Sequence, residues 1–133
     1  DQLSFKCTAF FRAHPASATQ AATLTPGVSV DDSRSLSEAL EVADFVVCGS
    51  MSSVSLDAYI AKKDPILILD GRSFISSPGE SMGPTFIATC SELVTALEHQ
   101  MKNGPCDSRD LSHLVFRDPS LSAWKSVIQR SGF

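Results

Sequence analysis

Two short apolar segments, residues 45–48 and 66–69, most strongly limit the fold, because neither alternates with polar residues. A strand of this composition is buried on both faces, which is typical of the centre of a parallel sheet. Between them, residues 53–62 carry apolar side chains at helical spacing. Strand, helix and strand in this order predict two parallel strands joined by a right-handed crossover.

The same alternation of strand and helix continues on both sides of this unit. Further strands are predicted at residues 5–12, 28–30 and 85–88, and further helices at residues 35–43, 92–102 and 120–130. The pattern predicts an α/β protein with a Rossmann-like three-layer α/β/α fold and a mostly parallel sheet of about five strands.

Polar residues mark where two of these helices begin. Positions 31–33 supply N-cap chemistry for helix 35–43. Ser91 is expected to cap helix 92–102 in the same way, because a serine oxygen can accept from a free N–H of the first turn.

The last predicted helix, residues 120–130, has a clear apolar stripe. Leu121, Trp124 and Ile128 recur there at helical spacing. Such a stripe is more typical of a helix packed on a core than of a cofactor site, so we expect these side chains to be buried.

Length and charge limit the class of protein. The chain has 133 residues, which suits one domain spanning residues 1–133, and its formal net charge is −4. Nucleic acid is not an expected partner, because its phosphates require clustered basic residues. No apolar segment approaches the roughly 18 residues of a membrane span, and no signal peptide is visible. Because the chain begins at Asp1 rather than Met and soon enters the strand predicted at residues 5–12, we expect a domain excised from a longer protein.

The cysteines indicate neither a metal site nor disulfide bonds. Cys7, Cys48, Cys90 and Cys106 form no C-x-x-C pair, so no zinc or other metal is expected. Cys7 and Cys48 fall inside predicted strands and are expected to be small buried hydrophobic residues. Reduced thiols suit a cytoplasmic location.

A small polar turn leads from strand 45–48 into helix 53–62, and we call residues 49–53 the serine turn. Parallel sheets bind ligands at the carboxyl ends of their strands, and the free N–H groups of a helix start attract phosphate. The hydroxyls could also serve as N-caps, which is compatible with phosphate binding. The residues expected to contact the phosphate of a nucleotide are Gly49, Ser50, Ser52 and Ser53.

Two further candidates, Arg12 and His14, follow the first predicted strand. A guanidinium and an imidazole at this strand end could bind the same phosphate from the opposite side. The alternative for His14 is a histidine that hydrogen-bonds a backbone carbonyl at the end of the strand.

Asp57 and Arg72 are candidates for contacts to a sugar or ribose. Asp57 lies one helical turn beyond Ser53 and could accept a hydrogen bond from a hydroxyl, or it could be a solvated helix residue. Arg72 follows strand 66–69 and could pair with phosphate or carboxylate, or it could be an exposed loop residue.

Several common motifs are missing from the serine turn. Its sequence, Gly-Ser-Met-Ser-Ser, is neither the G-x-G-x-x-G of dinucleotide-binding proteins nor a Walker A loop. It also lacks the second glycine of the G-x-S-x-G hydrolase motif. The sequence therefore disfavours NAD binding, P-loop ATPase activity and Ser-His-Asp hydrolysis.

Taken in order, the motifs resemble the C-terminal, donor-nucleotide-binding domain of GT-B glycosyltransferases. More narrowly, they are similar to bacterial surface-carbohydrate proteins of lipopolysaccharide, capsule and teichoic-acid-polymerase-like type. The resemblance covers roughly residues 5 to 100, and the segment 116–124 looks like the C-terminal tail of those proteins. The motifs are Arg12-Ala-His-Pro15, Leu36-Ser-Glu-Ala-Leu-Glu-Val-Ala-Asp-Phe-Val-Val47, Ser50-Met-Ser-Ser-Val-Ser-Leu-Asp-Ala58 and Asp64-Pro-Ile-Leu-Ile-Leu69.

This resemblance implies a nucleotide-sugar donor, no cofactor and no metal. His14 and the hydroxyls of Ser52 and Ser53 would face the donor's phosphates, whereas Asp57 stands where such families often carry glutamate. Residues 62–65, Lys-Lys-Asp-Pro, replace the usual Gly-Lys-Pro.

The resemblance also implies a partner domain. The acceptor site and any catalytic base would lie on a missing N-terminal domain of the same protein, so the isolated domain is expected to be inactive. It further allows peripheral membrane association of the whole protein.

Two alternatives remain open from the sequence. The chain could be a non-catalytic module that binds a nucleotide or a sugar phosphate. A flavodoxin-like or receiver-like domain fits less well, because a receiver needs acidic residues after its first strand, where this chain has Arg12-Ala-His14.

Overall fold

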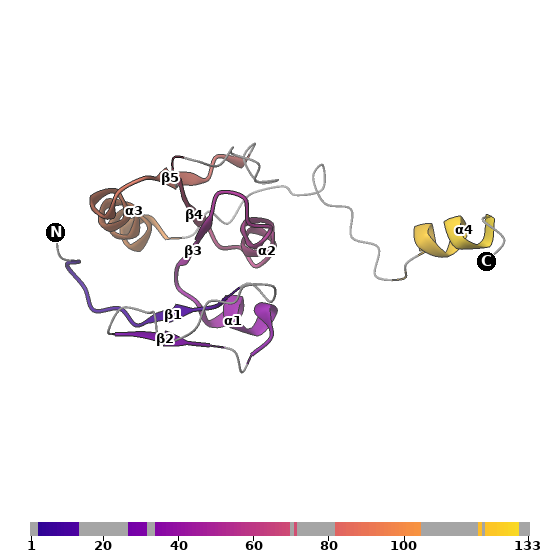
Figure 1. The fold of residues 1–133 in the computed structure, drawn as a ribbon, viewed down its shortest axis with the longest axis horizontal. Helices are drawn as coiled ribbons and strands as arrows, with labels where there is room; N and C mark the ends of the chain where they lie inside the picture. Colours follow the sequence, from indigo (N-terminus) through magenta and orange to yellow (C-terminus); the bar gives the residue numbers. More distant parts are fainter. Residues whose placement is uncertain are drawn as a thin grey trace.

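The structure, a computed structural model, describes residues 3–13, 27–31, 34–69, 71, 82–104, 120 and 122–130. Its elements follow one another as strands and helices in the predicted alternation (Figure 1). They are β1 (Ala9–Phe11), β2 (Val28–Val30), α1 (Leu36–Val42), β3 (Val46–Gly49), α2 (Val54–Ile60), β4 (Pro65–Ile68), β5 (Thr85–Ile87), α3 (Cys90–Asn103) and α4 (Ser122–Arg130).

All the strand pairs in the described residues are parallel, as the sequence predicts, but they form two sheets. β1 pairs with β2, and β4 lies between β3 and β5. The prediction of one sheet of about five strands is therefore wrong. An apolar run indicates that a strand is buried, but it does not indicate which strand lies beside it.

Helices cover both faces of the three-stranded sheet, so this part of the chain has α/β/α layers (Figure 1). On one face Leu40 of α1, Val46 of β3 and Ala58 of α2 form one buried cluster. On the other face Ile66 of β4 and Ile87 of β5 pack against Ala96 of α3. Val46 and Ile66 lie on opposite faces of the sheet. Ile66 is paired with Val47, and Val46 and Val47 point to opposite faces because they are neighbours in the strand.

Contacts near the amino ends of the strands connect the two sheets. The rings of Phe5, before β1, and Phe45, directly before β3, have centroids 5.9 Å apart. The backbone N–H of Ser4 donates to Glu98 Oε1 of α3 at 3.2 Å. The start of the chain is thereby held beside the three-stranded sheet.

Most elements are shorter than the sequence predicts. β1 begins at Ala9 rather than at residue 5, and α2 begins at Val54. β4 begins at Pro65, which is acceptable because the first residue of a strand can lack an N–H donor.

Capping boxes, not the predicted caps, begin α1 and α3. Ser35 caps α1 together with Glu38, and Thr89 caps α3 together with Glu92. The hydrogen bonds that Glu38 accepts from Ser35 lower the pKa of its carboxyl, and those that Glu92 accepts from the backbone of Ala88 and Thr89 do the same. The prediction that Ser91 caps α3 is wrong, as is the assignment of the α1 cap to residues 31–33. Asp32 and Ser33 lie outside the described residues.

The end of α2 contains a backbone conformation that glycine usually adopts. Lys62 has a φ of 60°, and its N–H donates to the Tyr59 carbonyl at 2.9 Å. The N–H of Lys63 donates to the Ala58 carbonyl, also at 2.9 Å. This pair of bonds is a Schellman motif with lysine at the left-handed position.

We expect Thr89→Ala to lower the free energy of unfolding by about 1 kcal/mol, because the N–H of Glu92 loses its acceptor. Ser91→Ala is the matched control, since Ser91 lies in the same turn but is not the cap. Urea unfolding followed by circular dichroism measures both. Equal losses from the two variants would contradict the assignment of the cap to Thr89.

We expect Lys62→Gly to stabilise the chain by up to about 1 kcal/mol. The left-handed conformation costs a non-glycine residue roughly 1–2 kcal/mol, and the greater flexibility of unfolded glycine offsets part of the gain. Lys63→Gly at the next position should be neutral or destabilising. A melting temperature lower for Lys62→Gly than for the original chain would rule out strain at Lys62.

Candidate functional site

The serine turn lies at the carboxyl end of β3, at the edge where parallel sheets bind ligands. Gly49 is the last residue of β3, and its carbonyl accepts a hydrogen bond from the N–H of Ser52 at 2.9 Å. The N–H of Ser50 donates to the Ile68 carbonyl of β4 at 3.2 Å. The turn is thus anchored to the neighbouring strand.

Hydroxyl groups of this region bond to the backbone of the turn itself. Ser52 Oγ accepts from the N–H of Val54 at 3.2 Å, and the buried Ser55 donates through Oγ to the Ser52 carbonyl at 2.9 Å. The N-cap position of α2 is Ser53, whose side chain makes no capping bond, and the hydroxyl that accepts from the first helical N–H belongs to Ser52, one residue earlier.

Two backbone amides of the turn have no hydrogen-bond partner among the described residues, those of Met51 and Ser53. Both residues are exposed, whereas Ser50 is only 4% exposed. A ligand that reaches this turn therefore meets the residues Met51 and Ser53 before Ser50. An amide pair of this kind can donate to the oxygens of an anion.

Asp57 adds a negative charge to the same helical turn. It is half-buried in the first turn of α2, and its carbonyl accepts from the N–H of Ala61 at 2.9 Å. Its carboxylate is favourable at a helix start but would repel a phosphate placed close to it. Asp57 thus suits the predicted contact to a sugar or ribose hydroxyl better than a contact to phosphate.

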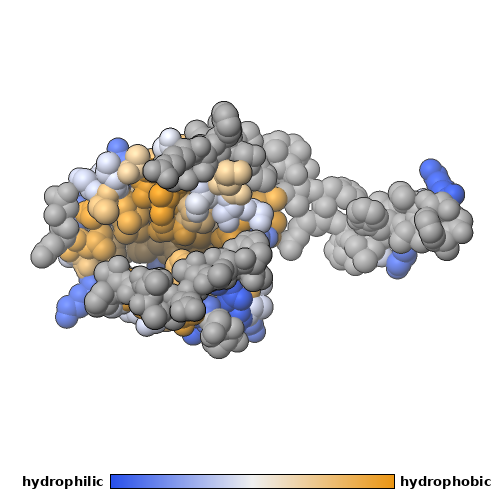
Figure 2. Space-filling model, in the orientation of Figure 1, coloured by the Kyte–Doolittle hydropathy of each residue, from blue (hydrophilic) through white to orange (hydrophobic). Residues whose placement is uncertain are grey.

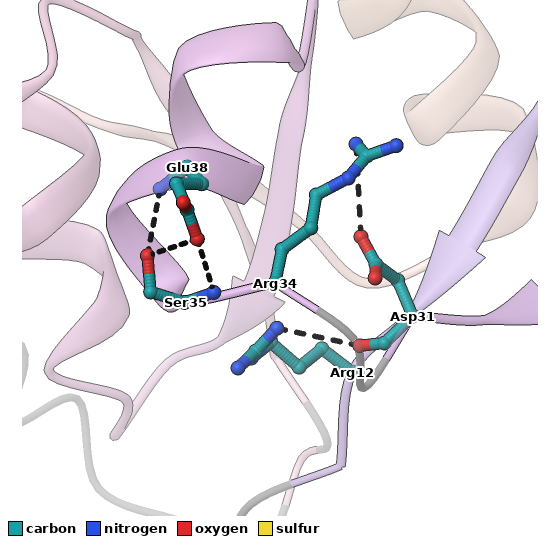
Figure 3. A network of polar contacts seen from close by, with 5 residues as sticks. All are labelled: Arg12, Asp31, Arg34, Ser35 and Glu38. Atoms are coloured by element: carbon teal, nitrogen blue, oxygen red, sulfur yellow. Dashed lines mark hydrogen bonds and ion pairs between the residues drawn. The ribbon is translucent and has the colours of Figure 1, made fainter.

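Arg12 lies at the carboxyl end of β1, in the two-stranded sheet (Figure 3). Its exposed guanidinium donates through Nη1 to the Asp31 carbonyl at 3.3 Å. The Asp31 carboxylate in turn pairs with Arg34 Nη1 at 3.8 Å. Because β1 is not hydrogen-bonded to β3, the structure does not join Arg12 and the serine turn through a common sheet.

His14 and Arg72 lie outside the described residues, so their predicted roles stay predictions. Arg34, which lies before α1 and pairs with Asp31, is not among the residues predicted from the sequence. The amide of Met51 is not among them either, because the order of side chains carries no direct signal of a free backbone donor.

The described cysteines are not organised as a nucleophilic or metal site. Burial raises the pKa of the half-buried Cys48 thiol to about 11, which disfavours the reactive thiolate. Cys7 is exposed and precedes β1, so its prediction as a buried strand residue is wrong. Cys90 is exposed at the start of α3. Cys106 lies outside the described residues.

Among the described residues, no three or more His, Cys, Asp and Glu side chains gather in an arrangement that could hold a metal ion. No described helix combines the length and apolar composition needed to cross a membrane.

Comparisons with protein-family models, curated proteins and solved structures gave no match. The strongest candidates for ligand contact are the amides of Met51 and Ser53, because both residues are exposed, lie at a strand end and have no described partner for their N–H.

We expect Cys48 to resist alkylation at pH 8 in the folded chain. A pKa of about 11 in place of 9.0 leaves it roughly 100-fold less thiolate. In a Cys106→Ser background, mass spectrometry after iodoacetamide treatment should show modification of Cys7 and Cys90 before Cys48. Unfolding in guanidinium should abolish the difference, and rapid labelling of folded Cys48 would contradict its burial.

Proposed function

We propose that this chain binds the phosphates of a nucleotide-sugar donor at the serine turn, as the donor domain of a glycosyltransferase-like protein in surface polysaccharide biosynthesis. One observation carries the proposal. In the turn that joins β3 to α2, at the carboxyl edge of a parallel sheet, the amides of the exposed residues Met51 and Ser53 have no partner among the described residues. The choice of a sugar donor comes from the resemblance of the sequence to GT-B glycosyltransferases.

The proposal includes a Rossmann-like arrangement in which the ends of β1 and β3 flank one crevice. The contact between Phe5 and Phe45 supports it, because these residues precede β1 and β3. The crossover from β2 to β3 through α1 supports it as well, since α1 packs against β3. Connections that diverge from neighbouring parallel strands leave such a crevice between them.

Each residue has a defined task in this proposal. The amides of Met51 and Ser53 donate to phosphate oxygens, and Arg12 supplies the positive charge from the opposite side. Asp57 accepts from a hydroxyl of the sugar or ribose. Amides held by a fixed turn need little reorganisation, so they stabilise the charge that develops on the leaving nucleotide. The acceptor and the catalytic base belong to the partner domain.

The alternative, a non-catalytic module for a nucleotide or a sugar phosphate, uses the same amides. The two functions differ in selectivity for the ligand. A donor domain should bind a nucleotide-sugar more tightly than a sugar phosphate, because it also recognises the nucleoside.

We expect uridine, cytidine or guanosine diphosphate to shift the amide signals of Met51 and Ser53 in NMR spectra of the isotope-labelled chain. Ser53→Pro should weaken this binding about tenfold, because it removes a donor to a charged phosphate. The backbone tolerates proline there, since Ser53 has a φ of −65° and its N–H has no described partner.

Ser53→Ala is the matched control, because it removes only the hydroxyl and keeps the amide. It should weaken binding less than Ser53→Pro, and a thermal melt should show that both variants fold. No shift of either amide at millimolar nucleotide would refute the phosphate site. Shifts with sugar phosphate alone would favour the binding module.

A further inference from the structure

One face of the three-stranded sheet is covered only in part. Val47 of β3 and Ile68 of β4 are 41% and 44% exposed. Val47 lies beside Ile66 and Ile68 lies beside Ile87, and both partners are buried against α3. The exposed pair therefore belongs to the face that α3 covers, next to the area that α3 reaches. We call Val47 and Ile68 the open patch.

Figure 2 shows where apolar residues reach the surface on one side of the molecule. Apolar side chains gather in a hollow of the molecule, between the elements around α3 and β5 and those around β1 and β2 (Figures 1 and 2). The opposite face of the sheet is packed by both α1 and α2. The two faces are thus unequally covered, and large aliphatic residues remain in contact with water on one of them.

The sequence of the helix α4 has an apolar side that could cover such a patch. Its described exposed residues are all polar: Ser122, Lys125, Gln129 and Arg130. Trp124, Val127 and Ile128 of its sequence recur on the other side of a helix. A helix of nine residues is only marginally stable in water unless its apolar side packs on something. Figure 1 draws α4 apart from the other elements.

The connection is long enough for α4 to reach the open patch. Residues 105–121 separate Gly104, at the end of α3, from Ser122, at the start of α4. An extended chain of this length spans roughly 50 Å, which exceeds the diameter of a small domain. The reach therefore places no restriction on docking.

We propose that α4 packs through its apolar side on the open patch, beside α3, and completes the helical layer on that face. The connection between β1 and β2 is a weaker occupant, because its residues 14–26 contain a single large aliphatic residue, Leu24. The α4 sequence offers a tryptophan and two branched aliphatic residues within five positions.

Fluorescence tests this packing directly, because Trp124 is the only tryptophan of the chain. We expect blue-shifted emission and weak acrylamide quenching for the unmodified chain at micromolar concentration. Val47→Glu in the open patch and Val127→Glu in α4 should each shift the emission to the red and raise quenching several-fold. The second variant lies outside the sheet and spares its core.

Two matched controls accompany these variants. Lys125→Glu changes an exposed residue of α4, and Val42→Glu changes a valine of α1 that is 64% exposed outside the open patch. Neither should alter the emission. Emission typical of a water-exposed indole in the unmodified chain would overturn the proposal. A blue shift that is lost when a dimer dissociates on dilution would also overturn it, because a second copy of the chain would then occupy the open patch.

Discussion

The described structure depends on the burial of the first three residues of β4, Pro65 to Leu67, between helices on its two sides. Ile66 and Leu67 have no exposed surface, and they lie on opposite faces of the strand. Ile66 packs against α3, while α2 lies on the other face of the sheet over β3 and β4. The side chain of Gln100 links α3 to the residue before β4, because it donates to the Asp64 carbonyl at 3.0 Å. With β4 fixed in this way, β3 and β5 have a template to pair with on each edge.

The position of the serine turn follows from this central strand. The bond from the N–H of Ser50 to the Ile68 carbonyl extends the ladder between β3 and β4 into the turn. Within the turn the Gly49 carbonyl accepts from the N–H of Ser52, and the hydroxyl and carbonyl of Ser52 accept from the first N–H groups of α2. The bonds of Ser52 and Ser55 thus stabilise the start of α2. Of the backbone amides in this turn, only those of Met51 and Ser53 have no hydrogen-bond partner among the described residues.

The two candidate halves of the site differ in how the sequence encodes them. The serine turn is local, so a strand, a small polar turn and a helix in sequence were sufficient to place it at a sheet edge. The position of Arg12 relative to it depends on whether β1 and β3 are neighbours, and no local pattern specifies this. Capping was also predictable in principle, because Ser35 and Glu38, like Thr89 and Glu92, have the spacing of a capping box.

The sequence by itself determined the order of strands and helices, their parallel pairing and the location of the serine turn. Apolar spacing, turn residues and caps act between residues that are close in the chain, so they can be read along it. Only the tertiary structure decided that the strands form two sheets and that Cys48 is half-buried while Cys7 is exposed. Those properties depend on contacts between segments that are distant in the chain. The free energy of packing between such segments decides which strands pair and which side chains are buried, and no single segment determines it.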